Sequence, residues 1–326
     1  MENLIEVKNL KKYFEVPNGF LNAVDDVSFN IKEGETLGVV GESGCGKSTL
    51  GRVMLGLHKA TSGSIMFNGM DLSTFNKSEM IKMRKSMQII FQDPYASLNP
   101  RFTVAQIIEE PLKLHNIYRS KEERKKRVEE LMEMVGLSKR SYNLYPHEFD
   151  GGRRQRIVIA RALSINPKFV VCDEPVSALD VSVQAQILNL MLELQDKLGL
   201  TYLFISHDLS VVKHISDNVL VMYLGQVIEK APKKDLFKNP VHPYTKALLS
   251  AIPSVNVLEK RKKIILKGEL SSPINPIDGC RFASRCQFAL DKCFNSNPVY
   301  REIETEHFIA CHRAEELLEN KIGYFI

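Results

Sequence analysis

Residues 41–48 read Gly-Glu-Ser-Gly-Cys-Gly-Lys-Ser and match the pattern G-x-x-x-x-G-K-[ST] of a phosphate-binding loop. Glycines allow successive backbone N–H groups to turn toward phosphate oxygens, and the N-terminus of a following helix adds the positive end of its dipole. Lys47 is expected to reach the β- and γ-phosphates and Ser48 to hold Mg²⁺, whereas Cys45 is a small residue that the loop tolerates. The residues expected at the nucleotide are Gly41, Ser43, Gly44, Cys45, Gly46, Lys47, Ser48 and Thr49.

Two adjacent carboxylates follow an apolar run at residues 169–172. Asp173 would coordinate Mg²⁺ through water, and Glu174 would orient or deprotonate an attacking water. The alternative is a pair of surface acids at the end of a strand. The organised loop at residues 175–180 favours the catalytic interpretation.

A histidine follows the next apolar run. Residues 202–205 are apolar, and His207 comes shortly after them. A single histidine is usually structural. Because it follows two strands that carry phosphate-site residues, His207 is interpreted as a sensor of the γ-phosphate.

Apolar patterning predicts the elements that position these residues. Residues 4–8 and 24–31 alternate as half-buried strands do, whereas 36–40 fit a strand covered on both faces. A helix is predicted from Ser48 to Leu57 and an amphipathic helix over 121–135, whose basic run 124–127 is expected to face solvent. Strands that alternate with helices predict an α/β fold.

Length and composition narrow the class of protein. The chain has 326 residues, enough for about two domains, with 44% hydrophobic and 25% charged residues. Lys+Arg 44 minus Asp+Glu 39 gives a net charge of +5, too small an excess to indicate nucleic-acid binding. No apolar run approaches the ~18 residues of a membrane span, and the N-terminus lacks a signal-peptide pattern, so a cytosolic location is expected.

Several segments resemble the ATP-binding cassette (ABC) family. Gln92, in the segment Ile90–Pro94, is similar to the glutamine of the Q-loop, which the resemblance places at the γ-phosphate and Mg²⁺. Residues 177–180, ending in Asp180, are similar to the D-loop, and His207 to the switch histidine. Phe14 stands where the family stacks an aromatic ring on adenine. Tyr13 is the close alternative for this role. The structural alternative is that Phe14 is an aromatic residue of the hydrophobic core.

Longer segments resemble the F-type ATPase subunits of oligopeptide and dipeptide permeases, namely 91–100, 173–183 and 239–245. The resemblance implies a P-loop NTPase fold of the ABC cassette, with a RecA-like core, an antiparallel β layer and a helical subdomain inserted at about 93–160. Residues 1–231 would form the nucleotide-binding domain and 232–326 an irregular C-terminal extension. ATP and Mg²⁺ are the ligands implied.

The same resemblance implies partners and a place in the cell. A second ATPase subunit, of the D type, would complete a head-to-tail heterodimer. Two transmembrane permease subunits would dock near Gln92, and an extracytoplasmic solute-binding protein would act indirectly, with no nucleic acid involved. The chain would lie at the cytoplasmic face of the cell membrane as a peripheral protein.

The signature element departs from the family pattern. It usually reads L-S-G-G-Q and acts on ATP held by the partner cassette, but residues 149–153 read Phe-Asp-Gly-Gly-Arg. Gly151 and Gly152 remain, while Asp150 replaces serine and Arg153 replaces glutamine. A carboxylate about 4 Å from a phosphate would be repelled by ~4 kcal/mol at an effective dielectric of 20. Arg153 could cancel much of this, so an impaired second ATP site and harmless drift both stay open.

Four of the six cysteines lie near the C-terminus: Cys280, Cys286, Cys293 and Cys311. Their spacing, C-x5-C-x6-C-x17-C, lacks the C-x2-C pair of most zinc sites, which makes zinc the second choice. Four thiolates suit an iron–sulfur cluster, and the resemblance implies a [4Fe–4S] cluster here. The basic residues Arg281, Arg285 and Lys292 would offset its negative charge. Free structural thiols are the remaining alternative.

These features predict an ATPase that powers import of peptides or a related solute, with Lys47, Glu174 and His207 as catalytic residues and Ser48, Gln92 and Asp173 around Mg²⁺. The first alternative is a soluble ABC-type ATPase that takes no part in transport. The second is a mainly structural nucleotide-binding subunit whose partner hydrolyses ATP. The intact Glu174 and His207 argue against the second.

Overall fold

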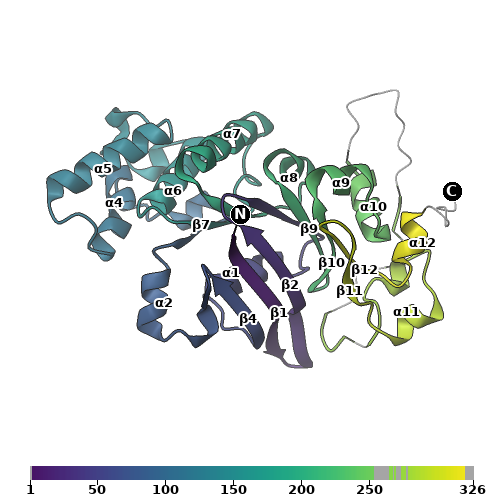
Figure 1. Ribbon diagram of the computed structural model, residues 1–326. Coiled ribbons are helices and arrows are strands. Elements are labelled where there is room, and N and C mark those ends of the chain that lie inside the picture. The colour runs from purple at the N-terminus through teal and green to yellow at the C-terminus, as the bar shows by residue number, and fades with distance from the viewer. Residues whose placement is uncertain (1, 253–263, 267, 269–272, 277, 320–326) are drawn as a thin grey trace. The chain divides into compact units, whose positions relative to one another are not determined.

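A computed structural model describes residues 2–252, 264–266, 268, 273–276 and 278–319 (Figure 1). Two compact units divide the chain. The helical unit comprises residues 74–205 with two short pieces, 1–2 and 32–35. The phosphate-loop unit comprises 3–31, 36–73 and 206–326. Each unit is described by itself.

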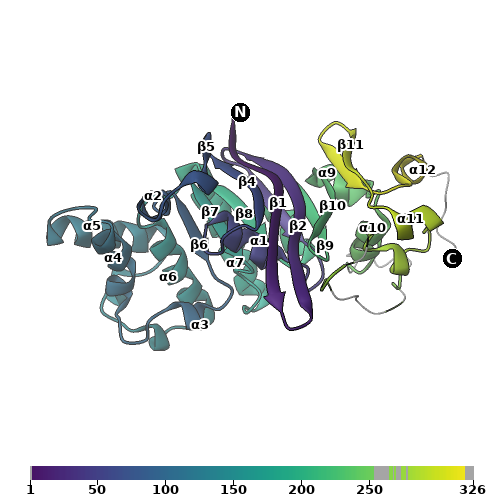
Figure 2. The ribbon, with the colours of Figure 1, turned by 90° about the horizontal axis from the view of Figure 1, so that it is seen from below.

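The first sheet of the phosphate-loop unit has the strand order β2-β1-β4-β5 (Figure 2). Its strands are β1 (Asn3–Val16), β2 (Gly19–Lys32), β4 (Ser62–Phe67) and β5 (Met70–Asp71). β4 runs antiparallel to both β1 and β5, and Val7 pairs with Ile65. Alternating apolar residues such as Ile5 and Val7 are buried, as the pattern predicted. The antiparallel layer is therefore present.

The second sheet of this unit has the order β11-β12-β10-β9-β3. The strands are β3 (Thr36–Val40), β9 (Asn218–Tyr223), β10 (Gln226–Pro232), β11 (Tyr300–Glu304) and β12 (His307–Ala310). β3 and β9 are parallel, while β9, β10, β12 and β11 pair antiparallel in turn. All five residues of β3 are buried, which confirms the prediction of a covered strand.

Short helices surround these sheets. They are α1 (Lys47–Met54), α8 (Leu209–Ile215), α9 (Lys233–Lys238), α10 (Pro243–Ser250), α11 (Asp291–Asn295) and α12 (Ala314–Leu318), with single 3₁₀ turns at Leu72–Thr74 and Ala283–Arg285. α1 ends at Met54 rather than at the predicted Leu57, since Gly56 adopts a positive φ of 62°. Figure 2 shows α10, α11 and α12 gathered at one end of the unit.

The helical unit contains three parallel strands, β6 (Met87–Ile90), β7 (Phe169–Asp173) and β8 (Thr201–Ile205), with β7 between the others. Its helices are α2 (Lys77–Met83), α3 (Pro94–Ser97), α4 (Val104–Leu114), α5 (Lys121–Met134), α6 (Gly151–Leu163) and α7 (Val181–Leu198), with 3₁₀ turns at Lys139–Ser141 and Pro146–Glu148. Helices α4, α5 and α6 contact one another. Parallel strands with intervening helices confirm the α/β prediction.

Helix α5 has the predicted apolar stripe, with Val128, Leu131 and Met132 fully buried. Its basic run is only partly exposed, which differs from the prediction of a solvated face. Arg124 is 19% exposed and donates from Nε to Glu109 Oε1 of α4 at 2.9 Å. An arginine can cover apolar surface with the methylene groups of its side chain while its guanidinium pairs with a carboxylate.

Within the described part of the chain, no helix combines the length and apolar character needed to cross a membrane.

Candidate active site

The phosphate loop connects β3 to α1 in the phosphate-loop unit. Gly46 precedes α1 with a φ of 103°, a conformation that residues with a Cβ rarely adopt. A Cβ on Gly46 would lie 2.0 Å from the carbonyl oxygen of Ala23, so the loop can take this path only with glycine. A Cβ on Gly44 would meet nothing within 4 Å, which leaves open space beside the loop.

Lys47 lies inside the loop, with 6% of its surface exposed. Its ammonium donates to the carbonyl oxygens of Gly41 at 2.8 Å and Glu42 at 3.0 Å. A charge this deeply buried needs such acceptors. The side chain is thus held by the loop that the sequence predicts to surround the phosphates.

The neighbouring residues of the loop lie between β3 and the first turn of α1. Cys45 is 1% exposed, and burial raises the pKa of its thiol, so the neutral group acts as a small packing residue. Ser48 and Thr49 lie in the first turn of α1, where backbone N–H groups have no partner within the helix. Ser43 precedes them in the loop.

The two carboxylates belong to the helical unit. Asp173 is the last residue of β7 and is 4% exposed. Glu174 follows it with a φ of 52°, unusual for a residue with a Cβ, and its N–H donates to Ile205 O at 3.0 Å. Strained backbone of this kind persists where surrounding structure imposes it, often at functional sites.

Gln92 and Glu174 are brought together by strand pairing. Ile90 of β6 pairs with Cys172 of β7 in parallel register, so residues two positions further on reach the same edge of the sheet. There the side-chain amide of Gln92 donates from Nε2 to Glu174 Oε2 at 3.0 Å. An amide in this place can bind the carboxylate or a nearby metal-bound water.

The signature segment begins helix α6. Asp150 is the N-cap, and its Oδ1 accepts from Arg153 N at 2.8 Å. The Arg153 guanidinium lies 3.5 Å from the other carboxylate oxygen, and both side chains are 64% exposed. The pairing that the sequence left open is therefore present, but solvent screens it.

The signature glycines lie against the D-loop of the same chain. A Cβ on Gly151 would lie 3.1 Å from Leu179 Cδ2, and one on Gly152 only 2.5 Å from Val183 Cγ1. Asp180, the residue before α7, is exposed. These glycines therefore have a packing role within this chain, besides any role toward a partner.

His207 and the aromatic candidates belong to the phosphate-loop unit. His207 is exposed, two residues after the end of β8. Phe14 makes an edge contact with His58 at 5.5 Å between ring centroids, and the Lys12 ammonium lies 4.6 Å from its ring. The Tyr13 hydroxyl donates to Asp25. The Phe14 ring is therefore contacted by the Lys12 ammonium, whereas the Tyr13 hydroxyl is hydrogen-bonded to Asp25. The assignment of Phe14 to adenine stays a prediction.

The four C-terminal cysteines line one small cavity of about 20 Å³. Backbone N–H groups approach their sulfurs, among them Leu290 N to Cys293 Sγ at 3.5 Å and Arg313 N to Cys311 Sγ at 3.4 Å. Burial nevertheless raises the pKa of Cys280, Cys286 and Cys311 to about 11. Within the described residues, no three histidine, cysteine or acidic side chains already hold the geometry of a metal site.

The sequence analysis missed a group of contacts around the loop. Glu42 N donates to the Tyr244 hydroxyl at 2.9 Å, and the Glu42 carboxylate pairs with Arg285 Nη1 at 2.9 Å. Arg281 pairs with Asp25. Both arginines were expected to offset the negative charge of an iron–sulfur cluster. Their guanidinium groups instead pair with the carboxylates of Asp25 and Glu42. No sequence signal joins residues more than two hundred positions apart.

Comparison with known proteins agrees with this geometry. The family model described as "ABC transporter" matches residues 24–177, and the model described as "Oligopeptide/dipeptide transporter, C-terminal region" matches residues 228–293. The chain resembles the dimeric post-hydrolysis cassette MJ0796 bound to ADP and Pi, with a TM-score of 0.65 and 31% identity over 70% of this chain and 98% of that one. The chain also resembles CbiO1 from Clostridium perfringens, with a TM-score of 0.66 and 30% identity over 74% of this chain and 93% of that one.

Close relatives extend over nearly the whole length. The chain is 54% identical to the oligopeptide transport ATP-binding protein AppF of Bacillus subtilis, over 95% of this chain and 97% of the relative. It is 50% identical to the oligopeptide transport ATP-binding protein OppF of the same organism, over 96% of this chain and 98% of the relative. The chain belongs to the ATP-binding proteins of ABC transporters, and it has the ABC cassette fold. Within that family it groups with the oligopeptide and dipeptide branch and is an ATPase that uses ATP and Mg²⁺.

Proposed function

We propose that this chain is the ATP-hydrolysing subunit of an ABC importer that takes up peptides or a related solute. The observation that carries the proposal is that one chain matches both the cassette and the C-terminal region of oligopeptide/dipeptide transporters. The relatives named as oligopeptide transport proteins cover almost all of it. We expect two transmembrane permease subunits, a solute-binding protein and a D-type second ATPase as partners, at the cytoplasmic face of the membrane.

In this proposal the described residues divide the hydrolysis reaction among them. Lys47 and the loop amides neutralise the phosphates, Ser48 and Asp173 hold Mg²⁺ with Gln92 nearby, and Glu174 orients water. His207 contacts the γ-phosphate, and Phe14 stacks on adenine. The amide of Gln92 contacts Glu174 directly and can relay the state of the carboxylate to a docked permease. The signature glycines and Asp180 complete the partner's site.

We also propose the domain organisation that the sequence suggested. Residues 1–231 would be the nucleotide-binding domain, with a helical subdomain at about 93–160. Residues 232–326 would be the C-terminal extension. The C-terminal family model begins at residue 228, close to this boundary.

We propose that the four cysteines hold a [4Fe–4S] cluster, with zinc as the alternative. The donor set fits, because the four cysteines line one cavity and backbone N–H groups approach their sulfurs, which stabilises thiolates. A cavity of about 20 Å³ has room for one water or ion, so a four-iron cluster would require the side chains to move outward. Such a cluster would serve as a structural crosslink of the extension.

Reconstitution tests the proposed function. The chain would be tagged, purified from its native membranes and its companions identified, and the assembled complex placed in liposomes. ATPase activity should rise when a peptide-loaded binding protein is added, and the isolated chain should hydrolyse ATP poorly because half of each composite site is absent. Full ATPase activity of the isolated chain, with no membrane companion and no peptide response, would favour the soluble ATPase instead.

A further inference from the structure

The phosphate loop is held from the C-terminal part of the same unit. Glu42, the second residue of the loop, is bound through three of its groups. Its N–H donates to the Tyr244 hydroxyl at 2.9 Å, its carboxylate pairs with Arg285, and its carbonyl accepts from the Lys47 ammonium at 3.0 Å. One residue thus joins the extension to the side chain that meets the phosphates.

Arg285 is built into this position. Its side chain is 9% exposed, and Nη1 donates to both carboxylate oxygens of Glu42, at 2.9 and 3.2 Å. The same nitrogen contacts the Tyr223 hydroxyl at 3.3 Å. A buried charge that loses its partner is strongly destabilising. The pair therefore constrains the loop more than an exposed ion pair would.

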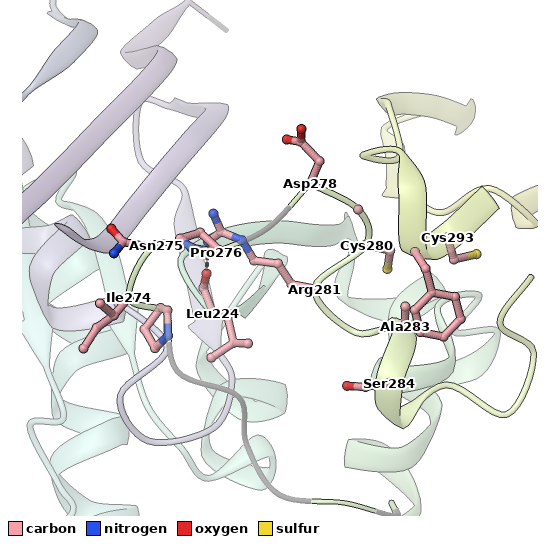
Figure 3. A pocket seen from close by; sticks show the side chains of 13 residues that line it. Leu224, Ile274, Asn275, Pro276, Asp278, Cys280, Arg281, Ala283, Ser284 and Cys293 are labelled. Carbon is pink, nitrogen blue, oxygen red and sulfur yellow. Dashed lines mark hydrogen bonds between the residues drawn. The ribbon is translucent and has the colours of Figure 1, made fainter. Parts of the chain in front are cut away.

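Arg281 forms a second buried contact, beside the loop rather than with it. Figure 3 shows its side chain directed to the carbonyl of Leu224, and the same guanidinium pairs with Asp25 of β2. Asp25 follows closely on Ala23, whose carbonyl lies where a Cβ of Gly46 would be. The Arg281 side chain is 7% exposed, so this contact is also buried.

Both arginines are adjacent in sequence to cysteines that line the small cavity. Arg281 follows Cys280, and Arg285 precedes Cys286. Between them Phe282 packs against Tyr223 at 5.4 Å and Tyr244 at 5.5 Å between ring centroids. Each arginine therefore shares a peptide bond with a cysteine of the cavity, and for Arg285 this gives a short covalent connection between a thiol and the contact with Glu42.

We propose that Arg285 is a positioning residue of the phosphate loop, and that through its contact with Glu42 the state of the four-cysteine site sets the affinity for ATP. The arginine does not touch nucleotide. It fixes Glu42, whose carbonyl aligns Lys47. Whatever the four thiols hold, reorganising Cys286 changes the grip of Arg285 on the loop.

The first experiment measures binding of a fluorescent ATP analogue with Mg²⁺ to the full-length chain. Arg285→Ala should raise the Kd at least about tenfold, a loss of ~1.4 kcal/mol of binding free energy. Arg285→Lys should restore part of the affinity, because a single ammonium can still pair with Glu42. Arg301→Ala is the matched control: Arg301 pairs with exposed Glu315 on the same extension, and its loss should leave the Kd unchanged.

A second variant keeps the test valid if Arg285→Ala does not fold. Glu42→Gln alters the same contact from the loop side, removes the charge and keeps the shape. It should also raise the Kd for the ATP analogue, because the contact between residue 42 and Arg285 is weakened. Unchanged affinity in both folded variants would overturn the positioning role.

The coupling is tested by a double-mutant cycle. Cys286→Ser should change the Kd for ATP in the unmodified chain but have a smaller effect in the Glu42→Gln background, since the connecting contact is already weakened. Equal effects in both backgrounds, or none in the first, would overturn the coupling. The metal content of each variant is measured in parallel, so that failure of the proposed cluster is recognised separately from failure of this coupling.

Discussion

Gln92 and Glu174 lie 82 residues apart in sequence, yet Nε2 of one is 3.0 Å from Oε2 of the other. The contact connects the end of β6 to the end of β7 within the helical unit. It places an amide, which can both donate and accept, against the carboxylate proposed as the base. The contact therefore couples the position of the Glu174 carboxylate to that of the Gln92 side chain.

Glu174→Gln should abolish hydrolysis while preserving nucleotide binding. Removing a general base typically costs ~10²–10⁴-fold in rate, whereas glutamine keeps the shape and the contact with Gln92. Phosphate release by the assembled complex and the Kd for ATP would be measured side by side. Glu193→Gln, on the exposed face of α7, is the control and should keep full activity. Wild-type turnover by Glu174→Gln would instead support the structural-subunit alternative.

Asp150→Ser should raise turnover at the site that the signature segment completes. Serine caps helix α6 as well as aspartate does, so stability should not change. The substitution removes the charge that the proposal places near the partner's phosphate. Arg153→Gln alone should lower turnover, because the cation 3.5 Å from Asp150 would no longer offset the carboxylate. The double variant is assayed in the reconstituted complex against Lys126→Gln, an exposed change on α5. Identical ATPase rates for all four variants would refute an impaired second ATP site and favour harmless drift.

Gly152→Ala should destabilise the chain by about 1–3 kcal/mol, because the new methyl would lie 2.5 Å from Val183 Cγ1. Gly152→Ala with Val183→Ala should recover the thermal unfolding midpoint by removing the clashing methyls. Comparing the ATPase of this double variant with that of Val183→Ala separates the two roles of the glycine. Recovered stability without recovered ATPase indicates a role toward the partner's nucleotide, and recovery of both leaves only packing.

The cysteine cavity should hold iron and labile sulfide after anaerobic purification, with broad absorbance near the blue edge of the visible range. Substituting Cys293, which lines the cavity, by serine should lower the iron content and the stability of the extension. Cys172→Ser is the control, since Cys172 is buried in β7 and is not among the residues that line the cavity. Stoichiometric zinc without iron would contradict the cluster and favour the zinc alternative.

His242 should make the fold sensitive to acid. Burial lowers its pKa to about 4, so between pH 6.5 and 4 the unfolded chain binds a proton that the folded chain does not. Stability should therefore fall by about 3 kcal/mol as pH decreases through this window and be unaffected above it. His242→Asn keeps an acceptor for Tyr244 N at the start of α10 and removes the titration.

Denaturant midpoints at pH 7.5 and 5 check this expectation. The difference between the two midpoints should shrink in His242→Asn and stay as in the wild type in His147→Asn, an exposed histidine of the helical unit. A pH response that is the same in all three proteins would show that His242 is not responsible.

Local patterns were sufficient wherever the chemistry lies in consecutive residues. The burial of β3, the buried stripe of α5 and the phosphate loop before α1 were all predictable, because backbone geometry imposes a period of two or 3.6 on neighbouring residues. The end of α1 was predicted wrongly, since a glycine in a positive-φ conformation overrides apolar continuity. The partial burial of Arg124 depends on a carboxylate from another helix.

The sequence by itself determined that this chain binds nucleotide phosphates, because glycines, lysine and serine at fixed spacing can do so without help from distant residues. Only the tertiary structure decided which groups control that loop. Arg285 contacts Glu42 across 243 positions of the sequence. In the helical unit, likewise, the position of Val183 leaves little room for a side chain at Gly152. Contacts between distant residues depend on how strands and helices are placed in space, and no local pattern records that placement.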